Sequence, residues 1–182
     1  MTEKEVILTE ENFRQGNVSL ILDSYDDLFS DFDPRPYHER AISGDFLDEC
    51  KRAARDKEQG MELRLLIPHE KRKINEEVKI IKRFKSHFQK HFKEKGKEII
   101  NIRKEGIQWF LIGGAIIFAS TFLYRLEGFL FNFLFVLSEP AGWFTLWTGL
   151  DKIFNESKKP EPDLGFNKKM SSAEISFIGY SP

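Results

Sequence analysis

Residues 107 to 150 decide the architecture of this chain, and they read IQWFLIGGAIIFASTFLY, then RLEG, then FLFNFLFVLSEPAGWFTLWTGL. The first run, Ile107–Tyr124, contains no charged residue, and the second, Phe129–Leu150, contains only Glu139. As helices these runs reach about 27 and 33 Å, close to the roughly 30 Å hydrocarbon thickness of a bilayer. The four residues between them suit a tight turn. The sequence therefore predicts a two-helix transmembrane hairpin.

Basic residues flank this hairpin at its chain ends rather than at its turn. They recur through 90–104 and again through 152–169, whereas the turn holds only Arg125. Because basic segments stay in the cytoplasm, we expect both termini to be cytoplasmic. The hairpin is expected to span the inner (plasma) membrane. The residues expected to contact lipid headgroups are Lys93, Lys95, Lys97, Arg103 and Lys104. A basic run could also bind nucleic acid, but no nucleic-acid-binding fold is recognisable, so membrane lipids are the expected partner and nucleic acid is not.

Charge is distributed unevenly along the 182 residues, although the net charge is only −1. The first 60 residues carry 15 acidic and 8 basic side chains, whereas residues 82–106 carry nine Lys or Arg and three Glu. The single cysteine, Cys50, leaves no internal disulfide to form and fits a reducing compartment. Residues 1–17 are polar, lack the apolar core of a signal peptide, and are expected to form a flexible tail.

Residues 18–106 are predicted to form a small cytoplasmic α+β domain. Val18–Asp23 and Glu62–Ile67 are apolar or β-branched and are bounded by polar residues or proline, which is typical of strands. Between them, Ser43 is expected to cap a helix that ends at Gly60. A strand, a helix and a strand in this order predict a parallel pair.

A long amphipathic helix is predicted to follow. Its apolar residues recur every three or four positions, at Ile74, Val78, Ile81, Phe84, Phe88 and Phe92. Gly96 and Gly106 could lie inside a helix continuous with the first span, or either could form a joint. His87 and His91 have the spacing of two metal ligands, but the lysines around them favour a solvated helix face. No metal and no cofactor are therefore expected.

Residues 151–182 are predicted to form a cytoplasmic tail. Pro160 and Pro162 should interrupt the chain after the second span, and Ala173–Tyr180 alternates like a strand that would join the same sheet. The expected fold class is thus α+β, a small cytoplasmic domain with a short sheet and a long amphipathic helix, plus the transmembrane hairpin formed by 107–150.

Glu139, together with Pro140 and Thr121, forms the predicted intramembrane polar site. Glu139 lies near the middle of its span, where an acidic residue costs roughly 2.5 to 3.5 kcal/mol. Pro140 removes the helix hydrogen bond to the carbonyl of Val136. One interpretation is a protonated carboxyl hydrogen-bonded to Thr121, to Ser120 or to a neighbouring copy. The other is a proton or ion site in the core of an oligomer.

Small residues spaced by four mark the predicted helix contacts, because they let helices approach closely. They are Ala115, Ala119, Ala141, Thr145 and Gly149. Packing within the hairpin would account for them, and self-association through one stripe is the alternative. We expect either a homo-oligomer or a subunit of a larger membrane complex.

The segment 31–37, which reads DFDPRPY, is the candidate site outside the hairpin, with Asp33, Arg35 and Arg40 as its candidate residues. Asp and Pro favour turns, so an ordinary structured loop is the preferred interpretation. Alternatively, Arg35, His38 and Arg40 could bind a carboxylate or phosphate, or the paired carboxylates could hold a metal. The sequence has no glycine-rich phosphate loop, no Gly-x-Ser-x-Gly and no His-Glu-x-x-His, so no catalysis is expected.

A series of short motifs occurs in a characteristic order. The motifs are Leu28-Phe29, Asp33 to Arg40, Leu63 to Ile67, His91-Phe92, Leu111 to Gly113, Glu139, Gly142-Trp143, Trp147, Ile153-Phe154 and Ala173 to Ile175. In this order they resemble a family of small prokaryotic two-span membrane proteins of no established function. The resemblance implies a cytoplasmic domain on a two-span anchor and supplies no activity. The expected function is a membrane-anchored interaction or scaffold protein without catalysis. The alternative is a subunit of an oligomeric pore or transport complex that uses Glu139.

Overall fold

The computed structural model describes residues 18–55 and 61–181, and the chain divides into two compact units. Residues 1–92 and 165–182 belong to the first, here called the sheet unit. Residues 93–164 form the second, here called the hairpin unit. The expectations for the 1–17 tail and for a helix end at Gly60 lie outside the described residues.

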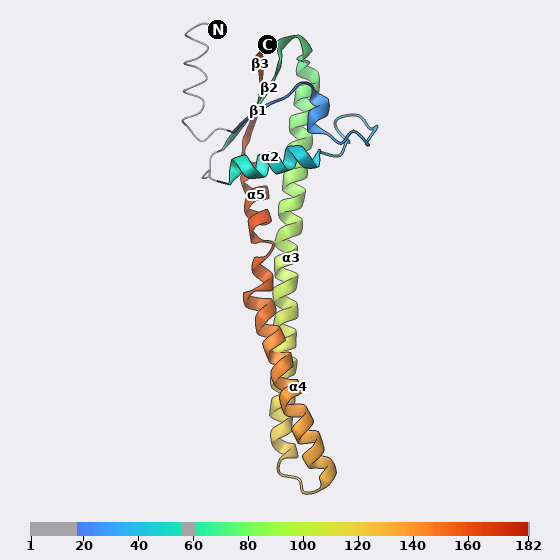
Figure 1. Cartoon of the computed structure of the whole chain (residues 1–182), viewed down its shortest axis with the longest axis vertical. Helices are drawn as coiled ribbons and strands as arrows, with labels where there is room; N and C mark the ends of the chain where they lie inside the picture. The colour runs from blue at the N-terminus through green and yellow to red at the C-terminus, as the bar shows by residue number, and fades with distance from the viewer. Residues whose placement is uncertain (1–17, 56–60, 182) are drawn as a thin grey trace. The chain divides into compact units, whose positions relative to one another are not determined.

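The sheet unit contains three parallel strands in the order β1-β2-β3 (Figure 1). The strands are β1 (Val18–Ile21), β2 (Glu62–Pro68) and β3 (Glu174–Tyr180). In the register, Val18 pairs with Leu63, and Leu63 pairs with Ile175. The predicted parallel pair and the α+β class are confirmed. The last strand, β3, joins the sheet beside β2, as predicted. β2 is therefore the central strand of the sheet.

One face of the sheet carries the core of this unit. Alternate side chains of β2, namely Leu63, Leu65 and Ile67, are fully buried, as strand periodicity requires. They share one apolar cluster with Phe46 and Cys50 of α2 (Gly44–Ala54). Ile80, Phe84 and Phe88 of α3 (Ile74–Leu123) complete this cluster. Ser43 precedes α2 as predicted, but its side chain makes no capping hydrogen bond.

The buried stripe of α3 differs from the predicted one in its first two turns. Ile74 and Val78 are 72% and 62% exposed, whereas Glu77 and Ile80 are buried. The apolar pattern was wrong there because the buried carboxylate of Glu77 has polar partners. The Tyr25 hydroxyl donates to it at 3.0 Å, and the Arg72 guanidinium donates two bonds of 2.9 Å. A buried carboxylate is tolerated when it is paired in this way.

This Glu77 cluster joins three segments of the sheet unit. The Tyr25 hydroxyl, from η1 (Tyr25–Leu28), also accepts the backbone N–H of Lys73 at 2.8 Å, just before α3. The hydrogen bond from Arg72 lowers the pKa of Glu77. Burial raises the pKa of Tyr25. The start of α3 is therefore fixed by polar contacts as well as by apolar packing.

In the hairpin unit, α3 continues to Leu123 without a break at Gly96 or Gly106, so neither glycine forms a joint. A turn then leads into α4 (Phe129–Phe154), which is continuous through Pro140. Gly128 in this turn has φ +131°, a conformation that residues with a side chain rarely adopt. The predicted two apolar helices are thus present and are packed as a hairpin.

Two short helices follow α4, where the sequence predicted only a break. They are η3 (Glu156–Lys158) and α5 (Glu161–Ser172). Pro160 lies in the turn between η3 and α5, so the helical structure is interrupted there as predicted. Pro162, however, lies in the first turn of α5. Proline is tolerated there because its missing N–H would have no partner inside the helix. Pro162 therefore starts a helix that was not predicted.

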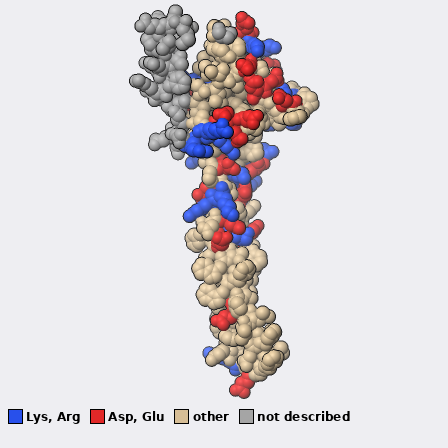
Figure 2. Space-filling view, in the orientation of Figure 1, with Lys and Arg blue, Asp and Glu red and all other residues tan. Residues whose placement is uncertain are grey.

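The surface of the hairpin is largely apolar. Figure 2 shows few charged side chains along most of its length on the visible face. In the most apolar windows of the two helical stretches, only 17% and 6% of the residues are buried. The core helix of a soluble protein would be mostly buried. Both helices are long and apolar enough to cross a membrane.

Candidate functional site

Four glycines bring the backbones of α3 and α4 into contact. We call them the glycine seam: Gly106 and Gly113 on α3, Gly142 and Gly149 on α4. A Cβ atom added at Gly113 would lie 2.8 Å from the carbonyl oxygen of Gly142, and closer still to the backbone nitrogen of Leu146. One added at Gly149 would lie 2.7 Å from the carbonyl oxygen of Gly106. No side chain larger than hydrogen fits these points unless the helices separate.

The predicted small-residue stripe is mostly elsewhere. Gly149 lies in the seam, but Ala115, Ala119 and Ala141 are exposed. Thr145 is half-buried, and its hydroxyl donates to the carbonyl of Ala141 at 2.7 Å. Packing within the hairpin therefore does not account for the alanines, and self-association through them stays a prediction.

A spacing of seven would have revealed the glycine seam from the sequence. Gly106 and Gly113 are seven residues apart, and so are Gly142 and Gly149. This is the heptad repeat with which two long helices keep one face together. The four-residue spacing used in the prediction instead selected a face that α3 and α4 leave open.

Glu139 lies on the exposed side of α4. The structure does not join it to Thr121 or Ser120, and both of those hydroxyls donate within α3. Thr121 donates to the carbonyl of Phe118 and Ser120 to that of Ile117, each at 2.7 Å. In the parts of the chain that are described, Glu139 has no hydrogen-bond or ion-pair partner. A partner from a second copy and an ion site both remain predictions.

Two of the five predicted headgroup residues are engaged within the hairpin unit. The ammonium of Lys95 lies 2.8 Å from Glu98, and this bond raises the pKa of Lys95. The guanidinium of Arg103 donates to Ser157 at 3.3 Å and lies 3.5 Å from Glu161. These polar contacts lie outside the apolar segment 107–150, at the end of the hairpin opposite its turn.

The continuity of α3 sets the distance of each basic residue from the span. At about 1.5 Å per residue, Lys93 lies about 21 Å and Lys97 about 15 Å before Ile107 along the helix axis. The headgroup layer is only about 6 Å thick on each side of the hydrocarbon. Arg103 and Lys104 are thus the nearest of the five residues to the apolar run, and headgroup contact by all five stays a prediction.

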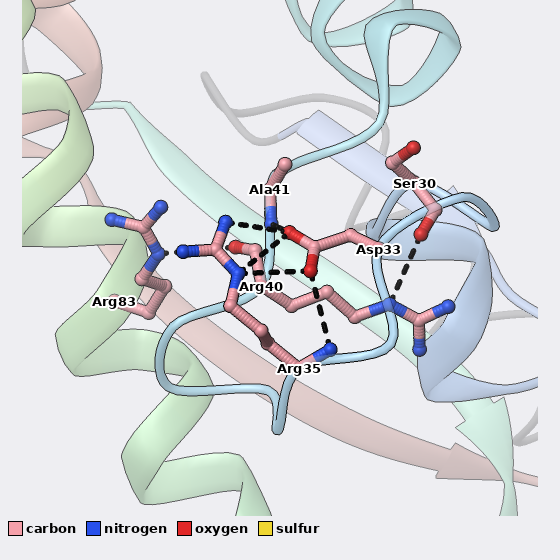
Figure 3. A network of polar contacts seen from close by, with 6 residues as sticks. All are labelled: Ser30, Asp33, Arg35, Arg40, Ala41 and Arg83. Carbon is pink, nitrogen blue, oxygen red and sulfur yellow. Dashed lines mark hydrogen bonds and ion pairs between the residues drawn. The ribbon is translucent and has the colours of Figure 1, made fainter.

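The loop after η1 brings the other candidate residues together (Figure 3). The carboxylate of Asp33 accepts bonds of 2.9 and 2.7 Å from the guanidinium of Arg35, and one of 2.7 Å from the backbone N–H of Ala41. The bonds from Arg35 hold the pKa of Asp33 well below its usual range. The loop thus closes on Asp33 as a local anchor.

Arg40 fixes the same loop from its other end. Its guanidinium donates to the carbonyl of Ser30 at 3.0 Å and to Asp26 at 2.6 Å. Its own carbonyl accepts a bond of 3.2 Å from Arg83 of α3. These contacts support the structured-loop interpretation, since Asp33 and Arg40 are both used to hold the loop. They also bring a cation of α3 to the loop, which the sequence did not indicate.

His87 and His91 lie close together, with ring centroids 4.3 Å apart. No further ligand joins them: within 18–55 and 61–181 there is no group of three His, Cys, Asp or Glu that could hold a metal. Burial raises the pKa of the Cys50 thiol to about 12, so this thiol is neutral and unreactive.

No family model matches this chain, and no curated protein and no solved structure matches it either. Of the resemblance to small two-span membrane proteins, the structure supports the two long apolar helices. Function therefore has to be argued from the residues themselves.

Proposed function

We propose that this chain is a membrane-anchored interaction protein without catalysis of its own. Its hairpin would span the inner (plasma) membrane, and both termini would lie in the cytoplasm. The observation that carries the proposal is the combination of a close backbone seam with an open apolar surface. Within the apolar segment 107–150, the seam uses the inner faces of α3 and α4, and most of the remaining surface is exposed.

Lipid is the medium that suits this surface. Phe129, Phe144 and Trp147 are 87%, 77% and 63% exposed, and similar side chains continue around both helices. Soluble monomers rarely expose contiguous apolar patches larger than a few hundred Å². Apart from the Val136 carbonyl, which Pro140 leaves without its helix donor, backbone polar groups inside the two helices are paired within each helix, as a bilayer requires.

The orientation can be tested with single cysteines, because the only native thiol is buried. In intact cells, a membrane-impermeant maleimide should label Glu127→Cys in the turn and should not label Lys159→Cys. Lysis should then expose Lys159→Cys to the reagent. Labelling of Lys159→Cys in intact cells, with Glu127→Cys protected, would reverse the proposed orientation.

The sheet unit offers surfaces through which such a protein could bind a partner. Among the described strands, β1 and β3 form the two edges of the sheet, since β2 lies between them. An open edge presents backbone donors and acceptors to another chain. We propose protein partners, either further copies or other subunits, together with membrane lipids, and no nucleic acid.

Glu139 gives the reason to expect assembly. A carboxyl directed at lipid costs roughly 2.5 to 3.5 kcal/mol, and a second copy that covers it would remove much of that cost. The exposed alanines Ala115 and Ala119 would allow close approach. The mass of the complex released in mild detergent tests this directly. A lone protomer would contradict the proposal, and a defined oligomer or co-purifying subunits would support it.

The runner-up function, a subunit of a pore or transport complex, rests on the same unpartnered carboxyl. Glu139→Gln distinguishes the two, with Glu127→Gln in the turn as the matched control. Lost assembly, with no ion flux in either form, supports an interaction protein. Unchanged assembly with abolished flux supports transport. The control should assemble like the original chain in both cases.

A further inference from the structure

Two neighbouring cavities lie between the 35–40 loop and the first turns of α3. Each has a volume of about 450 Å³, and His38 and Lys79 line both. We call the pair the basic groove. It is lined by six cations, namely Arg35, Arg40, Lys73, Lys79, Lys82 and Arg83. Among the described residues, Glu76 is the only carboxylate in its lining.

Three of the six cations are neutralised by a carboxylate. Arg35 is bound to Asp33, and Arg40 to Asp26. Lys79 lies 2.9 Å from Glu76. The excess positive charge of the groove therefore comes from the other three cations.

Lys73, Lys82 and Arg83 have no carboxylate partner within the described part of the chain. Lys73 and Lys82 are exposed. The Nε atom of Arg83 donates to the carbonyl of Arg40, and no described residue accepts from its two terminal nitrogens. Figure 3 shows Arg83 reaching from α3 to Arg40, and Arg35 bound to Asp33 within the loop. Three cations without a carboxylate partner, gathered along one groove, favour an anion there.

The groove is held in shape before any ligand arrives. Its loop wall is anchored by Asp33 and Arg40, and the ring of Tyr37 stacks on buried Phe29 with centroids 5.2 Å apart. Its helix wall is fixed by the Glu77 cluster at the start of α3. A preorganised site loses little entropy when it binds.

We propose that the basic groove binds a small soluble anion that bears two linked phosphate groups. Guanidinium groups match phosphate oxygens in geometry, and lysines add point charge. Each cavity has the size of a small-molecule site and brings its own free cations, Lys73 in the first, and Lys82 and Arg83 in the second. A diphosphate carries more charge than a single phosphate and is attracted by the free cations of both cavities. This inference goes beyond the membrane anchor and does not depend on it.

Sodium pyrophosphate is the probe for the test, titrated calorimetrically into the full chain in an uncharged maltoside detergent at low ionic strength. The matched variants are Lys73→Gln, Lys82→Gln and, as control, Lys85→Gln. Lys85 is exposed on the same helix but lines neither cavity. Each of the first two substitutions should weaken binding about tenfold, since each removes a charged hydrogen bond. The control should bind like the original chain.

Three results would overturn the proposal. The first is the absence of pyrophosphate binding by the original chain. The second is an equal loss in Lys82→Gln and Lys85→Gln, which would indicate nonspecific charge attraction. The third concerns lipid and is measured in nanodiscs of phosphatidylcholine with and without phosphatidylglycerol. Equal pyrophosphate affinity in both is expected, whereas loss of binding with phosphatidylglycerol would assign the groove to lipid headgroups.

Discussion

The glycine seam makes a sharp prediction from two neighbouring residues. A Cβ atom at Gly113 would lie 2.8 Å from both the Gly142 carbonyl oxygen and the Leu146 Cα, which are backbone atoms that cannot rotate away. At Gly114 a Cβ atom would meet nothing within 4 Å. Gly113→Ala and Gly114→Ala are therefore the same chemical change, one inside the contact between the helices and one outside it.

The expected difference in the free energy of unfolding follows from comparing the two variants. Replacing glycine by alanine inside a helix contributes up to about 1 kcal/mol of stability in either place. Only Gly113→Ala forces α3 and α4 apart, and overpacking of this kind costs typically about 1 to 3 kcal/mol. The free energy of unfolding of Gly113→Ala should thus fall below that of Gly114→Ala by about 1 to 3 kcal/mol.

The assay is reversible unfolding in mixed micelles, followed by tryptophan fluorescence. All three tryptophans, Trp109, Trp143 and Trp147, lie in α3 or α4 within the hairpin unit, so the signal reports the hairpin. Gly114→Ala should be as stable as the original chain or more stable. Equal free energies of unfolding for the two variants, within error, would refute the seam.

Three further predictions concern the sheet unit. Arg72→Met should destabilise it by about 2 to 3 kcal/mol, because it leaves the buried carboxylate of Glu77 without its cation, and denaturant unfolding followed by amide exchange measures this. Since the folded pKa of Glu77 is lowered, its contribution is present above the ordinary pKa of 4.5 and is lost as the pH falls below that value. In Arg72→Met, the free energy of unfolding should therefore fall less steeply as the pH drops below 4.5. An unchanged dependence of this free energy on pH would exclude Glu77 as its source. Asp33→Asn should speed hydrogen exchange at the amide of Ala41, and equal protection in both proteins would show that Asp33 does not hold the loop. Cys50 should resist Ellman's reagent until the chain unfolds, because burial raises its pKa to about 12, and rapid labelling of the folded protein would contradict its burial.

The parts of the fold that could be predicted are those in which one periodicity dominates. The β3 strand alternates with a period of two, and the two apolar runs are too long for ordinary core helices. The stripe of α3 was predicted correctly at Phe84 and Phe88, where nothing competes with apolar packing. It failed at Val78, because the Glu77 beside it is drawn into the interior by Tyr25 and Arg72. No pattern of hydrophobicity predicts a buried carboxylate whose partners include a hydroxyl 52 residues away in the sequence.

The candidate sites were harder to predict because they depend on residues far apart in the chain. Asp33, Arg35 and Arg40 were recognised as a group, since turn-forming residues surround them. Arg83 joins them only because α3 passes the loop, and one sequence does not record such a contact. Glu139 was identified by its position alone, and that position says nothing about the direction in which its side chain points.

Lipid as the medium around Ile107 to Leu150 is the central claim of this account. Sedimentation of lysed cells at high speed, followed by an alkaline carbonate wash of the pellet, tests it most directly. The chain should stay in the washed pellet and should be released only by detergent. A chain that remains in the supernatant as a single monodisperse species, with no detergent present, would contradict it.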